Sequence, residues 1–134
     1  MRIAQYEQKT VAMRKEIFLI DDDEYSLFIN REIIAEHTDL PIKCFNSGLE
    51  GLEYLQTEKS IELAWIFLDL NMPHMNGWQV LDTLISLDTP VVIKVYILSS
   101  SVDFKDKLRA KDYPLVKDYI LKPLESELAK NILR

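Results

Sequence analysis

The chain has 134 residues and a formal net charge of −6, with 16 basic and 22 acidic side chains. This length predicts one domain, and 48% hydrophobic residues suffice for a core. The acidic balance argues against direct nucleic-acid binding. No apolar run approaches the ~18 residues of a membrane span, so we expect no membrane insertion. The single cysteine, Cys44, cannot form an internal disulfide; we interpret it as a small buried side chain in a reducing cytoplasm.

Apolar runs of strand length recur along the chain. They cover residues 17–20, 42–45, 64–68, 95–98 and 119–121. Most show no polar alternation, which is typical of parallel strands that are buried on both faces. The mixed, polar start predicts a flexible arm over residues 1–15, followed by one domain over 16–134, and Met13 would serve equally well as a start.

Helical patterns separate these runs. They cover residues 24–36, a segment that starts at a capping-box pattern in 47–50, a segment after 76–77 that extends to 85, the weaker 102–110, and 124–132. Strand and helix therefore alternate five times. Short alternating units of this kind imply right-handed crossovers, so the fold class is α/β, a doubly wound, five-stranded parallel sheet with five helices on its two faces.

Four of the predicted strands stop at a polar residue that can do chemistry. These residues are Asp21, Asp22 and Asp23 after the first run, Asp69 after the third, Ser99 after the fourth and Lys122 after the fifth. Any one of them alone has an ordinary explanation as a helix cap or a turn residue. In an open α/β sheet, however, ligands bind outside the carboxyl ends of the strands. The pattern therefore predicts that these groups meet in one crevice.

Clustered carboxylates cannot all stay ionised unaided, so either one takes a proton or a cation binds. A small site with few oxygen ligands favours Mg²⁺, which keeps several of its waters. A nearby lysine then suits a phosphate group, and a hydroxyl can donate to a phosphoryl oxygen. Together these groups are the parts needed to place a phosphoryl group on an aspartate.

Four segments resemble the signature blocks of the receiver domain of two-component response regulators. They read FLIDDDEYS, IFLDLNMPHMNGWQVL, YILSSS and DYILKPL, and the resemblance covers residues 16–134. The block from Asp69 to Gly77 is specific by itself. The resemblance implies the flavodoxin-like strand order 2-1-3-4-5 and the function of a stand-alone, chemotaxis-type phosphorylation switch.

The resemblance also implies roles for individual residues. Asp69 would be the phosphoacceptor, and Asp22 and Asp69 would bind Mg²⁺ through their side chains. The backbone carbonyl of Asn71 would be a third metal ligand, and Asp21 would act mainly through a bound water. Ser99 and Lys122 would each bind a phosphoryl oxygen. Tyr119 stands at the family's switch-aromatic position, with Ser99 as its partner in the switch.

The sequence departs from the family pattern at two places. Ser100 stands where a small Ala or Gly is common, which predicts a slightly tighter phosphoryl pocket. Leu115-Val116 replaces a frequent Gly-Ala pair, so the family pattern does not predict the conformation of the turn before the last strand. Pro123 follows Lys122 where the family often has a cis bond, and the sequence alone leaves its isomer open.

Other conspicuous residues have ordinary explanations. His37 and His74 lack metal-ligand spacing. Trp65 and Trp78 are interpreted as packing residues. A basic series has acidic neighbours and is interpreted as a solvated helix face, with protein docking as the alternative; its members are Lys105, Lys107, Arg109 and Lys111.

The resemblance implies a phosphoryl donor that is a histidine kinase or a histidine phosphotransfer protein, and a cytoplasmic location. No residues remain for an attached output domain, so the signal would pass to a downstream protein, through a phosphorylation-linked dimer, or onward in a phosphorelay. We expect no enzymatic activity beyond the chain's own phosphorylation and dephosphorylation. Two alternatives are a phosphatase of the haloacid dehalogenase type and a receiver-like module that works without phosphorylation. The phosphatase needs an acid where Asn71 stands, and the complete set of site residues argues against the module.

Overall fold

The computed structural model describes residues 12–134; most of the predicted arm lies outside them. Its centre is a five-stranded parallel sheet in the order β2-β1-β3-β4-β5, as predicted. The strands are β1 (Arg14–Ile20), β2 (Ile42–Phe45), β3 (Ile61–Leu68), β4 (Val92–Ser99) and β5 (Val116–Leu121). The five helices of the described region are α2 (Glu24–Ala35), α3 (Gly48–Thr57), α4 (Gly77–Ser86), α5 (Phe104–Ala110) and α6 (Ser126–Leu133).

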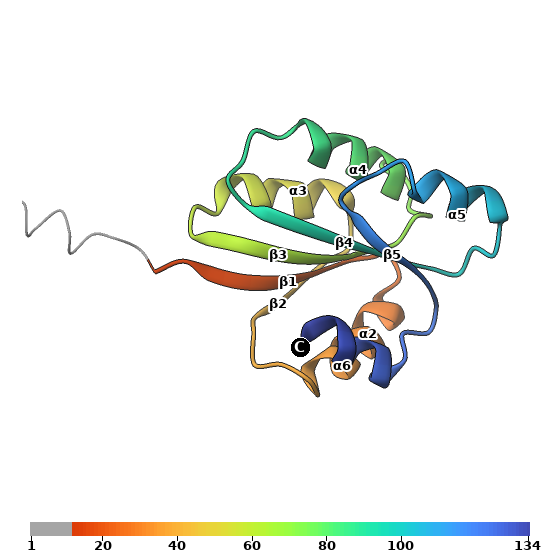
Figure 1. Cartoon of the computed structure of the whole chain (residues 1–134), viewed down its shortest axis with the longest axis horizontal. Coiled ribbons are helices and arrows are strands. Elements are labelled where there is room, and N and C mark those ends of the chain that lie inside the picture. The colour runs from red at the N-terminus through yellow and green to blue at the C-terminus, as the bar shows by residue number, and fades with distance from the viewer. Residues whose placement is uncertain (1–11) are drawn as a thin grey trace, which may run out of the picture.

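The helices cover the sheet in two layers. Figure 1 shows α3, α4 and α5 on one face and α2 with α6 on the other. Each layer closes its own apolar cluster: Val95 and Ile97 of β4 face the first layer, whereas Leu98 faces the second. The three-layer arrangement predicted from the alternating pattern is confirmed. None of the helices in residues 12–134 is long and apolar enough to cross a membrane.

Four strands begin earlier than the apolar runs suggested. Strand β1 begins at Arg14, so residues 14–15 of the expected arm belong to the sheet. Glu16 follows in β1 and is only 1% exposed, because Arg14 pairs with it and the Tyr54 hydroxyl donates to it at 2.8 Å. A charged residue in a strand is tolerated when burial is offset by such partners. This compensation lies 38 residues away in α3 and leaves no local pattern in the sequence.

Side-chain caps mark where four of the described helices begin, α2, α3, α4 and α5. Asp23 accepts from the Tyr25 amide at the start of α2, which confirms the capping interpretation of this residue. Ser47 caps α3, but the reciprocal capping box lies at α4, between Asn76 and Gln79. Each cap satisfies an amide that the first helical turn leaves without a partner. The caps of α2 and α4 follow directly on the loops that carry the acidic residues.

Cys44 corrects one sequence interpretation. It was expected to be buried, but it is exposed, because β2 is an edge strand with a single neighbouring strand, β1. Trp65 and Trp78 are each 8% exposed and pack in the two clusters, as interpreted. His74 is an exposed loop residue with φ 67°.

Candidate functional site

The carboxyl ends of the strands place the predicted residues at one edge of the sheet, to the right in Figure 1. The backbone hydrogen bonds of the sheet continue into these residues. The Asp69 amide donates to the Ile20 carbonyl at 3.0 Å, and the Lys122 amide donates to the Ser99 carbonyl at 2.9 Å. The Asp21 amide likewise bonds to β2. The side chains of the site are therefore held by the register of the sheet.

Three carboxylates form the acidic part of the site. Asp21, Asp22 and Asp69 each offer an oxygen, and these oxygens lie within 4.8 Å of one another. Asp21 and Asp69 are 5% and 6% exposed, whereas Asp22 is exposed to solvent. Such a set of hard oxygen donors, open to water on one side, fits a partly hydrated Mg²⁺. Asn71 lies two residues beyond Asp69 in the loop, where its backbone carbonyl remains a predicted ligand.

Lys122 is the cation of this cluster. Its Nζ lies 2.7 Å from an Asp21 oxygen and 3.6 Å from an Asp69 oxygen. Burial lowers the pKa of Lys122, but the hydrogen bond to Asp21 and the charge of Asp69 outweigh it, so its pKa is raised overall. Three ionised carboxylates and one ammonium leave a formal charge of −2, which a divalent cation would neutralise.

Asp69 carries the most perturbed carboxyl group of the site. Burial, and then the negative charge of Asp21, raise its pKa from 3.8 to about 6. Lys122 acts in the opposite direction but only partly compensates. A carboxylate that is destabilised in this way gains from any positive charge placed beside it. Both the electrostatics of the site and its set of oxygen donors therefore fit a bound divalent cation.

The loop after Asp69 is held by its backbone. Leu70 is 2% exposed, and its carbonyl accepts from the Gly77 amide at 2.9 Å. A Cβ at Gly77 would lie 2.6 Å from the Asp69 carbonyl oxygen and 2.9 Å from the Leu70 Cα. The first residue of α4 must therefore be glycine for the helix to approach the segment after β3 this closely.

Ser99 and Tyr119 are linked through one residue that the sequence did not single out. Ser99 is fully buried, and its hydroxyl accepts from the Ser101 amide at 3.1 Å. The Tyr119 hydroxyl donates to the Ser101 carbonyl at 2.9 Å, and the ring is half-buried against the core. Ser101 also donates to Asp106 of α5 at 2.6 Å. The loop after β4 thus connects the site to Tyr119 and to α5.

Two residues were missed in the sequence, Ser101 and Gly77. Ser101 is one of three consecutive serines, and nothing local distinguishes it from its neighbours. Gly77 follows an asparagine in what reads as a turn pair. Its role becomes visible only when the backbone of Asp69 lies beside it. Of the other residues considered, Ser100 is exposed, and the Lys122-Pro123 bond is cis.

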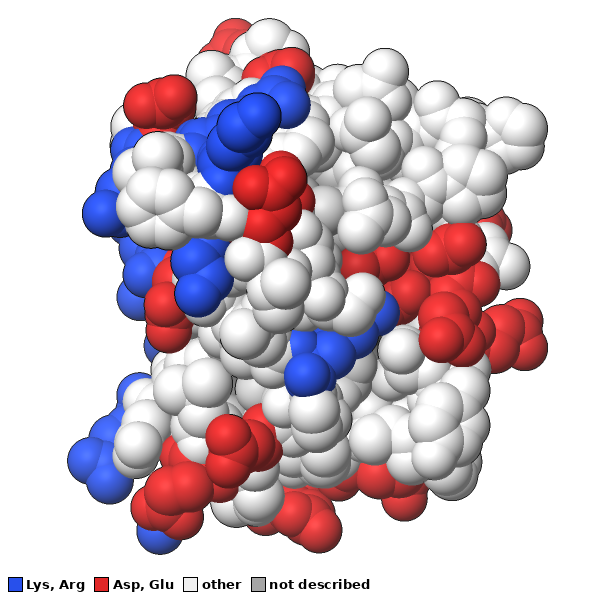
Figure 2. All heavy atoms as spheres, turned by 90° about the vertical axis from the view of Figure 1, so that its right-hand side faces the viewer, with Lys and Arg blue, Asp and Glu red and all other residues white. Residues whose placement is uncertain are grey.

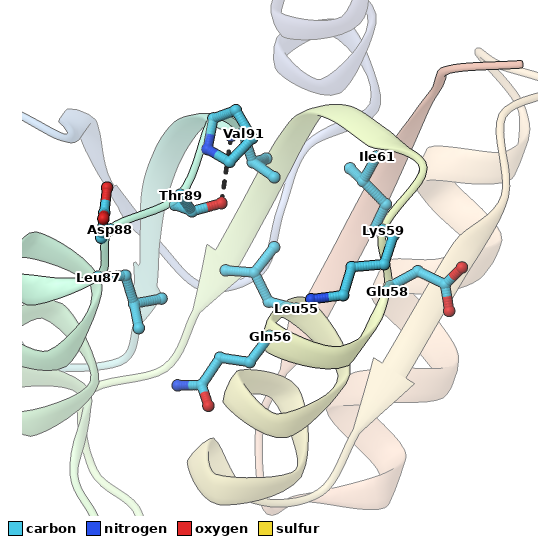
Figure 3. A pocket seen from close by; sticks show the side chains of 10 residues that line it. Leu55, Gln56, Glu58, Lys59, Ile61, Leu87, Asp88, Thr89 and Val91 are labelled. Atoms are coloured by element: carbon cyan, nitrogen blue, oxygen red, sulfur yellow. Dashed lines mark hydrogen bonds between the residues drawn. The ribbon is translucent and has the colours of Figure 1, made fainter. Parts of the chain in front are cut away.

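The surface supports the placement of the site at this edge. Figure 2 views the molecule from the carboxyl ends of the strands, and acidic side chains gather on one side of this face. A separate cavity of about 270 Å³ lies between the end of α3 and the segment that leads into β4. Figure 3 shows its lining, which includes Leu55, Lys59 and Thr89 and none of the predicted site residues. It lies at the opposite end of the strands.

The amino-acid sequence matches one known protein family over most of its length. The response regulator receiver domain matches residues 17–134. The chain belongs to this receiver-domain family. Its resemblance in sequence and its fold are both confirmed.

Curated relatives of this receiver domain include larger proteins. Two-component response regulator ARR12 of Arabidopsis thaliana is 30% identical over 127 residues, 94% of this chain and 20% of the relative. Cell cycle response regulator CtrA of Brucella ovis is 29% identical over 113 residues, 83% of this chain and 45% of the relative. The receiver domain thus spans between a fifth and a half of the length of these two relatives.

Solved structures carry the same fold. A two-component response regulator from Cytophaga hutchinsonii is 28% identical with a TM-score of 0.74, covering 90% of this chain and 94% of that one. The phosphorylated cyanobacterial phytochrome response regulator RcpA is 28% identical with a TM-score of 0.73, covering 90% and 91%. Membership in this family implies phosphorylation-dependent two-component signalling.

Proposed function

We propose that the chain is a phosphorylation switch in which Asp69 accepts a phosphoryl group from a phosphohistidine donor. The observation that carries the proposal is the meeting of Asp21, Asp22, Asp69 and Lys122 at one edge of the sheet. A donor of this kind would be a histidine kinase or a histidine phosphotransfer protein in the cytoplasm. The chain would promote only its own phosphorylation and dephosphorylation.

In the proposed transfer, an Asp69 carboxylate oxygen attacks phosphorus while the bond from phosphorus to the histidine nitrogen breaks. The imidazole leaves with that electron pair and takes up a proton from water. Asp21, Asp22, Asp69 and the Asn71 carbonyl would hold Mg²⁺, which would supply positive charge to the phosphoryl oxygens. Lys122 already lies 3.6 Å from Asp69 and would bind one phosphoryl oxygen. Ser99 would donate to another.

The donor would approach over α2. Tyr25 and Phe28 lie on this helix, directly after the acidic residues, and are 73% and 61% exposed. Tyr25 also lines a small hollow with Lys122 and Pro123. Exposed aromatic side chains beside a reactive group are typical of a protein-docking surface. These exposed side chains support an approach of the donor from the side of α2, close to Asp69.

The proposal is tested by replacing the phosphoacceptor, Asp69→Asn. After incubation with acetyl phosphate and Mg²⁺, intact mass should show one hydroxylamine-labile phosphoryl group on the wild type and none on the variant. Ser101→Ala is a matched control, because this residue lies at the same edge and offers no carboxylate. A labile phosphoryl group on Asp69→Asn would sink the assignment.

Magnesium should stabilise the fold through Asp22. At tenfold excess over its dissociation constant, the ion is expected to add about 1.4 kcal/mol to the free energy of unfolding of the wild type. Asp22→Ala should remove this gain. Asp23→Ala is the control: it removes the cap of α2 and costs about 1 kcal/mol, but it should keep the magnesium gain. Urea unfolding with and without the ion measures all three, and equal gains in both variants would place the metal elsewhere.

The switch should run from Asp69 through Ser99 to Tyr119. An acylphosphate adds an oxygen to which the Ser99 hydroxyl can donate if the loop after β4 moves inward, and the bond from the Ser101 amide to Ser99 would draw Ser101 along. That change would move the Ser101 carbonyl, to which Tyr119 is bonded. Beryllofluoride, a mimic of the phosphoryl group, should therefore change amide hydrogen exchange across residues 99–121 in the wild type.

Two variants separate the steps of this switch. Ser99→Ala should still take up a phosphoryl group but show little change in exchange across 99–121. Tyr119→Phe should keep the change near Ser99 and lose it around β5, since only the phenolic hydroxyl is removed. An unchanged response in Ser99→Ala would contradict the mechanism.

A further inference from the structure

The end of the sheet opposite the proposed site carries two adjoining hollows. The first is the cavity of about 270 Å³ shown in Figure 3. The second, of about 310 Å³, lies between the end of α4, the start of β4 and the residues that lead into β5. Both are lined by the segment between α4 and β4, and they share Leu87, Thr89 and Val91. We call the two hollows together the basal trough.

The basal trough is apolar inside and charged at one rim. Apart from Thr89, every residue that lines the second hollow is apolar, and Ile85 among them is 51% exposed. An open apolar surface of this kind is typical of a place that another segment or protein covers. The rim of the first hollow carries Lys59 and Asp88, which are both exposed. Within residues 12–134, neither of them forms an ion pair within 4.0 Å.

Strand β1 begins beside the first hollow. Arg14 lies opposite Ile61 in the sheet, and its amide donates to the Ser60 carbonyl at 2.8 Å. Its guanidinium donates to Glu58, which lines the first hollow, at 2.7 Å. Figure 1 shows that β1 starts at the end of the sheet where α3 ends and β4 begins. The start of β1 is therefore bonded directly to the wall of the basal trough.

The residues before β1 have the length and the composition to fill this trough. Eleven residues span at most about 36 Å, whereas β1 and β5 are three strand spacings apart, about 14 Å. Residues 1–11 read MRIAQYEQKTV, with apolar side chains at Ile3, Tyr6 and Val11. Between the last two stand Glu7 and Lys9, one charge of each sign. The rim of the first hollow offers the opposite charge to each of them.

We propose that residues 1–11 dock in the basal trough of their own chain. Val11 enters the first hollow, Tyr6 enters the second against Ile85, and the two charged residues between them meet the opposite charges of the rim. A second copy of the chain is the competing occupant. A short tether, however, gives its own segment an effective concentration in the millimolar range, which favours docking within one chain. This inference does not depend on phosphorylation of Asp69.

A spin label on the full chain tests where this segment lies. The label is attached to Gln8→Cys, a polar position, after the exposed Cys44 has been replaced by serine. In amide NMR spectra, the label should broaden the signals of residues 55–61 and 87–91, which contribute to the trough. The amides of residues 69–72, at the other end of the strands, should keep their intensity.

Variants within the segment separate docking from simple proximity. Tyr6→Ser combined with Val11→Ser should reduce the broadening at least about threefold, because the apolar surface that the trough buries is removed. Gln5→Ser combined with Thr10→Ser changes two polar positions of the same segment and should leave the broadening as it is.

A matched pair of variants tests the trough itself. Ile85→Asp should also reduce the broadening at least about threefold, whereas Leu49→Asp should not, since Leu49 is 55% exposed on α3 and lies outside both hollows. Broadening that is spread evenly over the surface or centred elsewhere would overturn the proposal, as would equal effects of the matched variants. Spin-labelled chain is finally mixed with isotopically labelled chain that carries no spin label. Broadening of the trough residues in this mixture would assign the trough to a second copy and overturn docking within one chain.

Discussion

Gly77→Ala should lower the free energy of unfolding by about 2–3 kcal/mol, because the new methyl group meets backbone that cannot move aside. The contacts at issue are the Asp69 carbonyl oxygen at 2.6 Å and the Leu70 Cα at 2.9 Å. Relieving them requires α4 to shift away from Asp69, the proposed phosphoacceptor. Labelling by acetyl phosphate should then slow at least about tenfold, since small misplacements of reacting groups are costly.

Gly51→Ala is the matched control for this prediction. Its Cβ would meet the Cδ1 of Ile20 at 2.7 Å, which is the far end of a side chain and can rotate. Alanine also gains about 1 kcal/mol of helix propensity over glycine in α3. Gly51→Ala should therefore stay within about 1 kcal/mol of the wild type in urea unfolding and keep its labelling rate. Equal destabilisation of the two variants would contradict the backbone explanation.

Without magnesium, Asp69→Asn should be more stable than the wild type at pH 7.5. The folded-state pKa of Asp69 is about 6, above its ordinary value of 3.8, so the folded chain binds the proton more tightly than the unfolded chain does. Stability therefore falls as pH rises between these two values, and the full cost is present above pH 7. With allowance for solvent screening, we expect that cost to be about 1–2 kcal/mol. The variant has no carboxylate at this position, so its stability is not lowered in this way.

The pH dependence makes this prediction specific. The advantage of Asp69→Asn should shrink through pH 6 and vanish near pH 4, where the wild-type side chain is protonated. With magnesium at pH 7.5, the wild type should be the more stable of the two proteins, because the ion binds the Asp69 carboxylate that the variant lacks. Asp39→Asn, an exposed carboxylate in another loop, should show neither effect. A variant that is less stable than the wild type at every pH would refute the charge-crowding argument.

The sequence predicted the parallel sheet and the meeting of the acidic residues with Lys122, because apolar runs and the residues that follow them are local patterns. The strand order was predicted only through the resemblance to receiver domains. The sequence did not predict the early part of β1, where the burial of Glu16 depends on Arg14 and on Tyr54 from another element. The exposure of Cys44 was missed for a related reason: an edge strand has the same apolar composition as a central one.

Within the site, the sequence could name side chains but not their distances. Ser101 became informative only through its bonds to Ser99 and Tyr119. The basic series was interpreted as a solvated face, and its lysines do lie at the surface. What the pattern could not show is that Lys117, from β5, joins Lys107 and Lys111 across a shared hollow. Long-range proximity of this kind depends on the packing of α5 against the sheet.

The backbone hydrogen bonds of the sheet continue as far as the amides of Asp69 and Lys122. This limits which insertions and deletions related chains can accept. A deletion of one residue within β3 would displace Asp69 by about 3.3 Å along the strand and turn its side chain to the other face of the sheet. No change elsewhere in the site could compensate for both errors. Length changes should therefore accumulate in connections such as residues 36–41, which lie outside the strands and helices, while the central strands keep their residue count.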